Sequence, residues 1–576
     1  MLTEWRTGKT VTLFRRTLLE VYAEAGETLN LGSSGVDVLP ASGGSIVLAD
    51  IVIWEPGIIA DKQAASLPTP SYSCKTSQPG KGKMTTRTQE LAGPLPNSGG
   101  YDPCVYTVPA NGIYHVAFYG PDGPNSDGNG QAGTIDAPNI TSTQASGVSM
   151  WDITVRDSNG LEKPGRVFSE YLAMITGGHG TTYRVNSTIY VVTKDGFKYQ
   201  VDLRGLDPYG FIIYGNSVGY YHPDGKTPLY HDLVATENTL ATPLGGVKLA
   251  PPSAKIFFDV PDSNIPSSII PVPQAPTISN ISFIGTADEN ISIYPTGGEF
   301  HYTGNIGGIA EVVVSRDGVD YDPTSPNNRV LRAEKAGGDQ YLTWNGLANN
   351  GIPFPPGGPY PFKISLHAGE YHFPMLDVEN SQLGGPTITL LNPPGGTCPF
   401  ASCSTAFYDD RGYQTSFGTV GTVNATLPGD TYSKLPPAID HSDLVLGFET
   451  MSTQRAIGDG TSQGFGNWKG LDLWTYFPSS AIVKDLYIID QPSQDLRLTK
   501  LHSGFFSTGI NGGEFIFQVL NTGTTTVSGT VNLVDDVPVG LTPVSAIGDG
   551  WNCSVIGQTV NCTHPNTSGL QIGASL

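Results

Sequence analysis

The stretch Ser187–Leu203, STIYVVTKDGFKYQVDL, carries the clearest structural signal in the chain. Its two runs of alternating apolar and polar residues meet at Asp195-Gly196, a dipeptide typical of a two-residue type I′ turn. Counting outward from that turn pairs Val192 with Tyr199 on an apolar face and leaves a mostly polar face for water. The stretch therefore predicts a β-hairpin at the surface of a β-sandwich.

Short alternating runs of this kind recur along the chain, each closed by Gly, Pro, Asn or Asp: Gly112–Tyr119, Ala310–Ser315 and Phe515–Leu520. Phe14–Ala25 has apolar residues at helical spacing, but the flanking stretches alternate, which favours a strand there as well. Glycine and proline supply 72 and 45 of the 576 residues, and only 14% of residues are charged. Both features disfavour long helices, because Gly and Pro penalise helix interiors and helix exteriors use charged residues.

We therefore predict an all-β protein with several immunoglobulin-like or jelly-roll β-sandwich domains in series and little helix. A chain of 576 residues is too long for one ordinary hydrophobic core. Loops rich in Gly, Asn and Pro separate the predicted domains. Their ranges are 1–125, 134–270 with the hairpin at 187–203, 277–395, 396–492 and 496–576.

The chain is acidic, with 31 Lys and Arg against 52 Asp and Glu and a net charge of −21. Binding to a nucleic-acid backbone depends on clustered positive charge, so nucleic acid is excluded as a partner. A hydrophobic fraction of 38% and an aromatic fraction of 10% are enough to fill cores, so the chain is expected to fold. No run of eighteen apolar residues occurs, and no transmembrane segment is predicted.

Six cysteines fall into three local pairs: Cys74 with Cys104, Cys398 with Cys403, and Cys553 with Cys562. Such pairs predict disulfides and an extracellular or cell-surface location, the alternative being reduced thiols in a cytosolic protein. A two-residue turn at Gly557-Gln558 places Cys553 opposite Cys562 on adjacent strands, within disulfide reach. The Cys74–Cys104 loop of some thirty residues should contribute about 3–4 kcal/mol of stability.

Two parts of the chain resemble known bacterial surface modules. The run WNGLANNGIPFPPGGPYPFKI at Trp344–Ile364 resembles the closing hairpin of the immunoglobulin-like domain in flagellar hook-capping proteins, although Asn345 stands where that family usually has Asp. The stretch from about Ser503 to the end is similar to an immunoglobulin-like repeat domain of unknown function on large bacterial cell-surface proteins. The matching pieces are VLNTG (Val519–Gly523), SGTVNLVDDVPVGLTPVSA (Ser528–Ala546) and GDGWNCSVIGQTVNC (Gly548–Cys562). The central regions are similar to uncharacterised bacterial surface proteins. The resemblance implies a stalk or adhesion module outside the cell.

Few residues point to catalysis, and we predict no catalytic residues. Two Gly-x-Ser-x-Gly motifs are centred on Ser217 and Ser462, but a nucleophile elbow needs a helix after the serine, and neither site predicts one. The segment from His367 to His372, HAGEYH, mixes imidazole and carboxylate groups. Glu370 and His372 share one face of a strand, which fits either a metal site or the polar edge of a sandwich.

Calcium is the one candidate cofactor. Asp317, Asp320 and Asp322 place several carboxylate oxygens in one loop, as calcium requires, and a plain Asx-type turn is the alternative. Trp474 and Tyr476 share a strand face and form a candidate ligand-binding platform for a sugar, with core packing as the alternative.

We expect a bacterial extracellular structural or adhesive protein, a stalk or filament subunit that presents loops to a surface polymer, glycan or protein partner. The alternatives are a carbohydrate-binding surface protein and a secreted hydrolase with Ser217 or Ser462 beside a histidine. The resembled repeat runs on past Gln571–Leu576, so an open sheet edge is expected there. Lys9–Leu13 of a neighbouring molecule could cover that edge by head-to-tail strand addition, and a truncated sequence is the other explanation.

Overall fold

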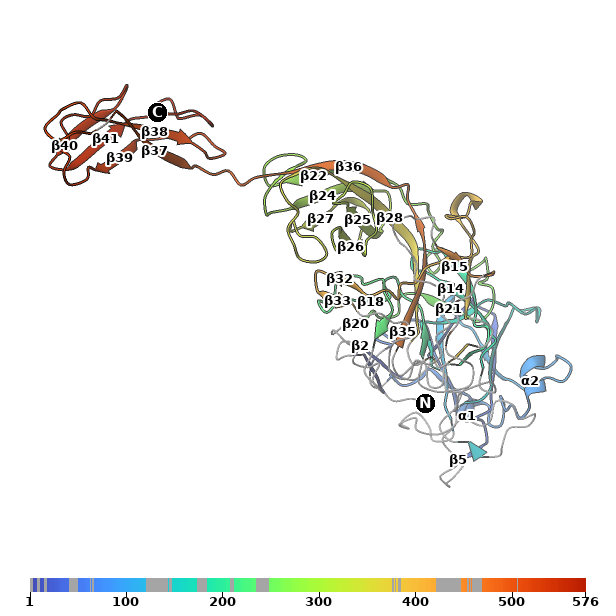
Figure 1. Ribbon diagram of the computed structural model, residues 1–576. Coiled ribbons are helices and arrows are strands. Elements are labelled where there is room, and N and C mark those ends of the chain that lie inside the picture. The colour runs from blue at the N-terminus through green and yellow to red at the C-terminus, as the bar shows by residue number, and fades with distance from the viewer. Residues whose placement is uncertain are drawn as a thin grey trace. The chain divides into compact units, whose positions relative to one another are not determined.

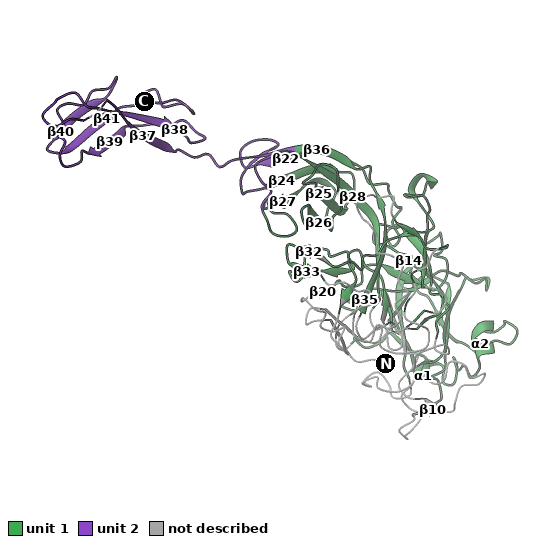
Figure 2. Cartoon of the chain, in the orientation of Figure 1, with its two compact units in different colours: residues 1–282, 299–352, 360–485 green, residues 283–298, 353–359, 486–576 purple. Residues whose placement is uncertain are grey.

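The computed structural model describes most of the chain, and this part forms two compact units (Figure 2). Unit 1 comprises Met1–Ser282, Glu299–Ile352 and Tyr360–Asp485, and unit 2 comprises Phe283–Gly298, Pro353–Pro359 and Leu486–Leu576. The described residues are 4–7, 11–14, 18–40, 50–62, 64, 67–120, 143–144, 148–173, 184–207, 212–234, 248–375, 378, 380–381, 385–420, 447–452, 455, 457, 469–504 and 506–576.

Strands dominate both units, and the prediction of an all-β fold with little helix is confirmed (Figure 1). Within the described ranges the helical elements are two short α-helices, α1 (Cys74–Ser77) and α2 (Arg87–Ala92), and one 3-10 turn, η2 (Pro394–Gly396). None of the described helices is long and apolar enough to cross a membrane.

The first sheet of unit 1 has nine strands in the order β30-β15-β14-β21-β12-β3-β9-β6-β7. Their bounds are β30 Thr387–Leu390, β15 Lys198–Asp202, β14 Thr188–Val192, β21 Lys255–Phe257, β12 Val167–Ser169, β3 Leu19–Ala23, β9 Gly112–Phe118, β6 Ile51–Trp54 and β7 Tyr72–Ser73. Neighbouring strands run antiparallel throughout. The sheet joins strands from the predicted ranges 1–125, 134–270 and 277–395.

A smaller sheet covers one end of the first and makes a sandwich. Its order is β11-β4-β8, with bounds Trp151–Arg156, Thr28–Ser33 and Cys104–Thr107. One hydrophobic cluster holds Leu29 and Leu31 of β4 together with Val21 of β3. The predicted strand near Phe14–Ala25 is therefore confirmed as β3. All five residues of β3 are buried, which is why its sequence lacks a clean alternation.

The hairpin predicted at 187–203 forms as β14 and β15, but the predicted pairing is wrong by one residue. Val191, and not Val192, lies opposite Tyr199. The backbone N–H of Thr193 donates to the carbonyl of Phe197 at 2.9 Å, so the loop contains three residues instead of two. Because side chains alternate between faces, the slip places Ile189 and Val191 of β14, instead of Tyr190 and Val192, on the face that carries Tyr199 and Val201.

The second large sheet of unit 1 holds the longest strand, β28, and has the order β19-β35-β28-β25-β26. The bounds are β19 Leu233–Val234, β35 Lys469–Pro478, β28 Gly357–Met375, β25 Gly308–Val314 and β26 Arg329–Lys335. One hydrophobic cluster packs β28 against the first sheet and includes Tyr371, Phe373 and Tyr199. The rings of Tyr199 and Tyr371 stack with their centroids 5.5 Å apart.

Unit 1 also contains short two-stranded ladders. They are β1 (Glu4–Thr7) with β2 (Val11–Phe14), β5 (Leu39–Pro40) with β10 (Thr143–Gln144), β13 (Tyr171–Ala173) with β17 (Ile212–Tyr214), β16 (Leu206–Asp207) with β29 (Asn380–Ser381), β18 (Tyr220–Tyr221) with β20 (Lys248–Leu249), β31 (Thr405–Ala406) with β34 (Phe448–Glu449), and β32 (Tyr413–Thr415) with β33 (Gly418–Val420). The proposed donor strand Lys9–Leu13 falls partly in β2, which pairs with β1, and Lys9 lies outside the described residues.

The stretch Trp344–Ile364 does not close as the predicted hairpin. Its first strand, β27 (Gly338–Trp344), belongs to a sheet with β22 (Ile278–Gly285) and β24 (Gly298–Gly304), whereas β28 pairs with β25 and β35. Trp344 is 2% exposed and anchors the end of β27 in the core. The connection between Trp344 and Ile364 therefore passes from one sheet to another.

The C-terminal part of unit 2 contains two small sheets. One is β37 (Leu496–Ser503) with β38 (Glu514–Asn521), and the other is β39 (Val531–Asp536), β41 (Thr559–His564) and β40 (Asn552–Ile556). Leu576 exchanges backbone hydrogen bonds with Val519 of β38 at 2.9 and 3.0 Å. The strands β23 (Ile291–Ile293) and β36 (Ile482–Ile489) pair in parallel, with Ile291 opposite Tyr487.

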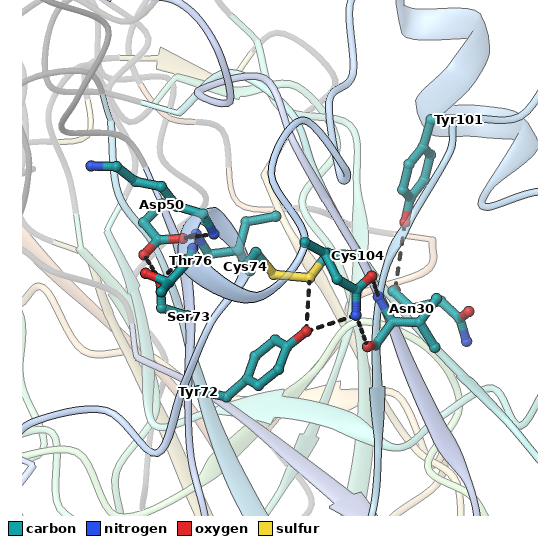
Figure 3. The surroundings of a disulfide bond; sticks show 12 residues. Asn30, Asp50, Tyr72, Ser73, Cys74, Thr76, Tyr101 and Cys104 are labelled. Atoms are coloured by element: carbon teal, nitrogen blue, oxygen red, sulfur yellow. Dashed lines mark hydrogen bonds between the residues drawn. A yellow bond between two sulfur atoms is a disulfide. The ribbon is translucent and has the colours of Figure 1, made fainter.

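All three predicted disulfides are present. Cys553 lies directly opposite Cys562 with a Cα–Cα distance of 4.0 Å, as the two-residue turn predicted. Cys74 and Cys104 are both buried and tie α1 to β8 (Figure 3). Asp50 supports this bridge, because its carboxylate accepts hydrogen bonds from the hydroxyl of Ser73 at 2.5 Å and from the backbone N–H of Lys75 at 2.9 Å.

Candidate functional site

The candidate site lies at an irregularity in the pairing of β28 with β35. Ala368 lies opposite Phe477 and Tyr371 lies opposite Thr475, so β28 has one more residue than β35 in this interval. Such a β-bulge re-aims the side chains around it. A regular strand would place His367 and Glu370 on opposite faces. With the extra residue, His367 Nδ1 lies 3.4 Å from Glu370 Oε2.

Gly369 makes the bulge feasible. Its φ is +58°, and a Cβ atom there would lie 2.5 Å from the ring of Phe197, so both backbone conformation and space require glycine. The first sheet also holds this residue in place. The N–H of Gly369 donates to Asp195 Oδ2 at 2.7 Å, and its carbonyl accepts a hydrogen bond from the Tyr199 hydroxyl at 2.7 Å.

Beyond the bulge, His372 lies between two buried carboxylates. Its Nδ1 is 2.8 Å from Asp472 Oδ2, and its Nε2 is 3.2 Å from Glu370 Oε1. The Tyr230 hydroxyl donates a 2.6 Å hydrogen bond to the same Glu370 oxygen. These side chains come from β28, from β35 and from the segment before β19, and all of them are buried.

The two carboxylates decide the charge of His372. Burial disfavours the imidazolium, but Asp472 and Glu370 outweigh this effect and raise the pKa of His372 to about 9. Burial likewise opposes ionisation of Glu370, yet hydrogen bonds from His367 and His372 hold its pKa below the usual value. At neutral pH the site therefore contains an imidazolium between carboxylates.

A second buried ion pair adjoins the first. Arg455 Nη1 donates to Asp232 Oδ1 at 3.0 Å, and the backbone N–H of Asp472 donates to the same oxygen at 2.8 Å. The guanidinium carbon of Arg455 also lies 3.9 Å from the ring centroid of Tyr408. Asp472 Oδ1 is buried without a hydrogen-bond partner. The site is thus a connected set of buried titratable groups, in which burial raises the pKa of Asp472.

The aromatic residues proposed as a sugar platform form walls of this site instead. Trp474 is 1% exposed and Tyr476 is 6% exposed, so neither ring offers a face to solvent. Tyr476 stacks on His367 with ring centroids 4.0 Å apart, and Trp474 stacks on His372 at 5.6 Å. These two rings therefore give no support to the carbohydrate-binding alternative.

One Gly-x-Ser-x-Gly motif packs onto the same cluster. The backbone of Asn216 exchanges hydrogen bonds with that of His372 at 3.2 and 2.8 Å. Gly219 is required there, because a Cβ would lie 2.1 Å from Asp472 Oδ2. The strand β17 precedes Ser217 and the strand β18 follows it, so the structure has no helix after this serine, as the sequence predicted.

A cavity of about 580 Å³ opens beside the bulge. Ser217, His367 and Glu370 all line it, together with Ser253 and Gly369. His367 Nδ1 and Glu370 Oε2 are buried and lie 3.4 Å apart, and neither atom has another partner among the described residues. Ser217, His367 and Glu370 therefore line one cavity with a hydroxyl, an imidazole and a carboxylate, which is a combination used in acyl transfer.

Other contacts limit what these groups can do. His367 Nε2 lies 3.3 Å from the hydroxyl of Ser365, and Ser365 is buried and does not line the cavity. Both ring nitrogens of His367 thus already face other side chains. The N–H groups of Val218 and Gly219 donate to Asn216 Oδ1, so they are not free to bind an oxyanion.

The candidate calcium loop is held together by its own hydrogen bonds. Asp317 Oδ1 accepts from the N–H groups of Val319 and Asp320 at 2.9 Å each, and Asp320 Oδ1 accepts from Asp322 at 2.6 Å. These backbone hydrogen bonds lower the pKa of Asp317. The contacts are those of Asx-type turns, and a calcium ion here stays a prediction.

The remaining predicted sites are the HAGEYH segment and Ser462. Among the described residues no three His, Cys, Asp or Glu side chains are grouped so that they could hold a metal ion, and this applies to the HAGEYH segment. Ser462, the centre of the other serine motif, lies outside the described residues.

Sequence reasoning missed Asp232, Asp472 and Arg455. A signal was present for Asp472, since it is the one charged residue in the apolar run GLDLWTYF, and a charge at an inward strand position implies a partner. Asp232 and Arg455 lie far apart in sequence and carry no comparable pattern.

No protein-family model matches the chain, and no curated protein matches it.

Proposed function

We propose that this protein is an extracellular or cell-surface structural protein, with an adhesive role for the loops that its sheets carry. The observation that carries the proposal is the set of three disulfides in a nearly all-β chain. Disulfides persist in oxidising compartments and are rare in the cytosol, where thiols are kept reduced. The acidic surface charge and the resemblance to bacterial surface modules agree with this role.

The test is to label intact cells that produce the protein with an antibody, and to map its peptides by mass spectrometry without reduction. We expect labelling of intact cells and the three linkages Cys74–Cys104, Cys398–Cys403 and Cys553–Cys562. Labelling only after permeabilisation, with free thiols at these positions, would contradict the proposal. Filament formation and calcium binding are finer parts of it, tested by sedimentation with and without residues 1–13 and with and without calcium.

A secreted hydrolase is the second candidate, favoured by one observation: Ser217, His367 and Glu370 line the same cavity. In this function Ser217 attacks an ester or amide carbonyl and His367 takes its proton, with Glu370 orienting the ring. The proton passes to the departing alcohol or amine as the ester or amide bond breaks, and water then hydrolyses the acyl-serine to release the acid. It ranks second because both nitrogens of His367 face Glu370 and Ser365 in this structure.

A serine-reactive fluorophosphonate separates the two candidates. A hydrolase predicts labelling of Ser217 that is lost in Ser217→Ala and kept in Ser253→Ala, a control serine on the same cavity wall. An unlabelled wild-type protein would remove the hydrolase and leave the structural role.

A further inference from the structure

A second cavity of unit 1, of about 250 Å³, lies against β26. Arg329 and Leu331 of this strand line it, and His222 and Phe417 also contribute to its wall. The rings of His222 and Phe417 stack with centroids 4.7 Å apart, and Phe417 is 44% exposed. The cavity thus combines an aromatic wall, apolar side chains and a cation.

The cation is unusual because none of the described carboxylates pairs with it. Arg329 as a whole is half-buried, but its Nε and Nη1 atoms are buried and have no hydrogen-bond partner among the described residues. Arg332, three residues further along β26, has a partner. Its Nε donates to Glu311 Oε2 at 2.6 Å. Of the two arginines on this strand, Arg332 is ion-paired, whereas two nitrogens of Arg329 have no partner among the described residues.

An arginine in this position stays charged. Burial lowers the pKa of Arg329, but a guanidinium keeps its proton in proteins. An uncompensated buried charge destabilises a protein, and native structures supply such donors with an acceptor. None of the described residues provides that acceptor, and an anion that enters the cavity can provide it.

The residues that line the cavity include the cations Arg329, Arg332 and Lys335 and none of the described carboxylates. Burial, with the fields of Arg332 and Arg329, lowers the pKa of His222 to about 4 despite the nearby Asp224, so the imidazole is neutral at pH 7. Lys335 also lines the cavity, and its ammonium lies 5.3 Å from the ring centroid of Tyr341. This cavity therefore attracts anions although the chain as a whole is acidic.

We propose that this cavity binds the carboxylate of a compact, ring-bearing acid, with Arg329 as the residue that pairs with the carboxylate and with the His222–Phe417 pair packing against the ring. Arginine donors recognise carboxylates through charge-assisted hydrogen bonds. Aromatic and apolar walls account for most of the contact area in small-molecule sites, and a few polar groups set specificity. The inference does not depend on the function proposed above.

Calorimetric titration of the full chain in a buffer without sulfate or phosphate tests the proposal. The probes are glucuronate and benzoate, which carry a carboxylate on a polyol ring and on an apolar ring, and glucose as the neutral comparison. We expect saturable binding of at least one acid and none of glucose. Arg329→Met should weaken binding by about thirtyfold or more, the loss typical of truncating a buried charged partner. Arg497→Met, on exposed β37, is the control and should bind as the wild type does.

Thermal unfolding without added anion excludes a merely structural role for Arg329. If Arg329 serves to bind an anion, Arg329→Met removes an uncompensated charge, and the unfolding midpoint of the variant equals or exceeds that of the wild type. Adding the acid should then raise the midpoint of the wild type alone. Failure of both acids to bind, equal binding by Arg329→Met, or a clear fall in its midpoint would each overturn the proposal.

Discussion

Replacing His372 with glutamine should abolish a pH dependence of stability that the wild-type protein shows between pH 6.5 and 9. The folded protein holds the proton of His372 with a pKa of about 9, against 6.5 for the unperturbed side chain. At 1.36 kcal/mol for each pH unit, the difference corresponds to about 3 kcal/mol.

The sign follows from the direction of the shift. Below pH 6.5 the proton is bound in both the folded and the unfolded state, and the stabilisation is fully present. Between 6.5 and 9 the unfolded chain releases the proton while the folded protein keeps it, so the free energy of unfolding falls as pH rises. Above about pH 9 the contribution is lost.

Hydrogen exchange followed by mass spectrometry is the suitable assay, because a chain with two compact units need not unfold in one step. Peptides from β28 and β35 report the local opening free energy after correction for the intrinsic pH dependence of exchange. We expect protection in these peptides to fall by about 3 kcal/mol from pH 6.5 to 9 in the wild type. His372→Gln should lower protection already at pH 6.5, because Asp472 and Glu370 lose their shared cation.

The control is His502→Gln, at an exposed position of β37. It should leave the pH profile of the β28 and β35 peptides unchanged. Parallel profiles for the wild type and His372→Gln would refute the reasoning, since the imidazolium would then not be the group that couples pH to the stability of this site.

Three further perturbations probe the disulfide, the bulge and the second ion pair. Cys74→Ala opens a loop with a sequence separation of 30 and should reduce the free energy of unfolding of its sandwich by about 3–4 kcal/mol in urea titrations. Gly369→Ala should cost about 2–5 kcal/mol because of its ring clash and positive φ, whereas Gly395→Ala, with φ of +70° but open space, should cost about 1–2 kcal/mol. Arg455→Met should lower the free energy of unfolding by about 3–5 kcal/mol, because it leaves Asp232 buried without its cation. Adding Asp232→Leu should recover most of that loss in the same urea titrations.

The fold class follows from local sequence physics. The frequent Gly and Pro residues, the scarcity of charged residues and the short alternating runs are all local features. Together they favour strands whatever the rest of the chain does. The same is true of the Cys553–Cys562 bridge, because a two-residue turn at Gly557-Gln558 determines which residues face each other. The hairpin register shows the limit, since a third loop residue before Phe197 moved every pair by one position.

The candidate site needed information that no local pattern holds. Glu370 and His372 are adjacent on one strand, and their shared face could be predicted. His367 joins them only because β28 contains one more residue than β35 at the bulge, which depends on how two strands distant in sequence are aligned. The sequence by itself determined that this is a disulfide-linked all-β protein, since turn chemistry, alternation and cysteine spacing are short-range properties. Only the tertiary structure decided that Asp472 contacts His372, with Asp232 and Arg455 next to Asp472, because charge pairing depends on which distant strands pack together. It also decided that two nitrogens of Arg329 are buried with no partner among the described residues.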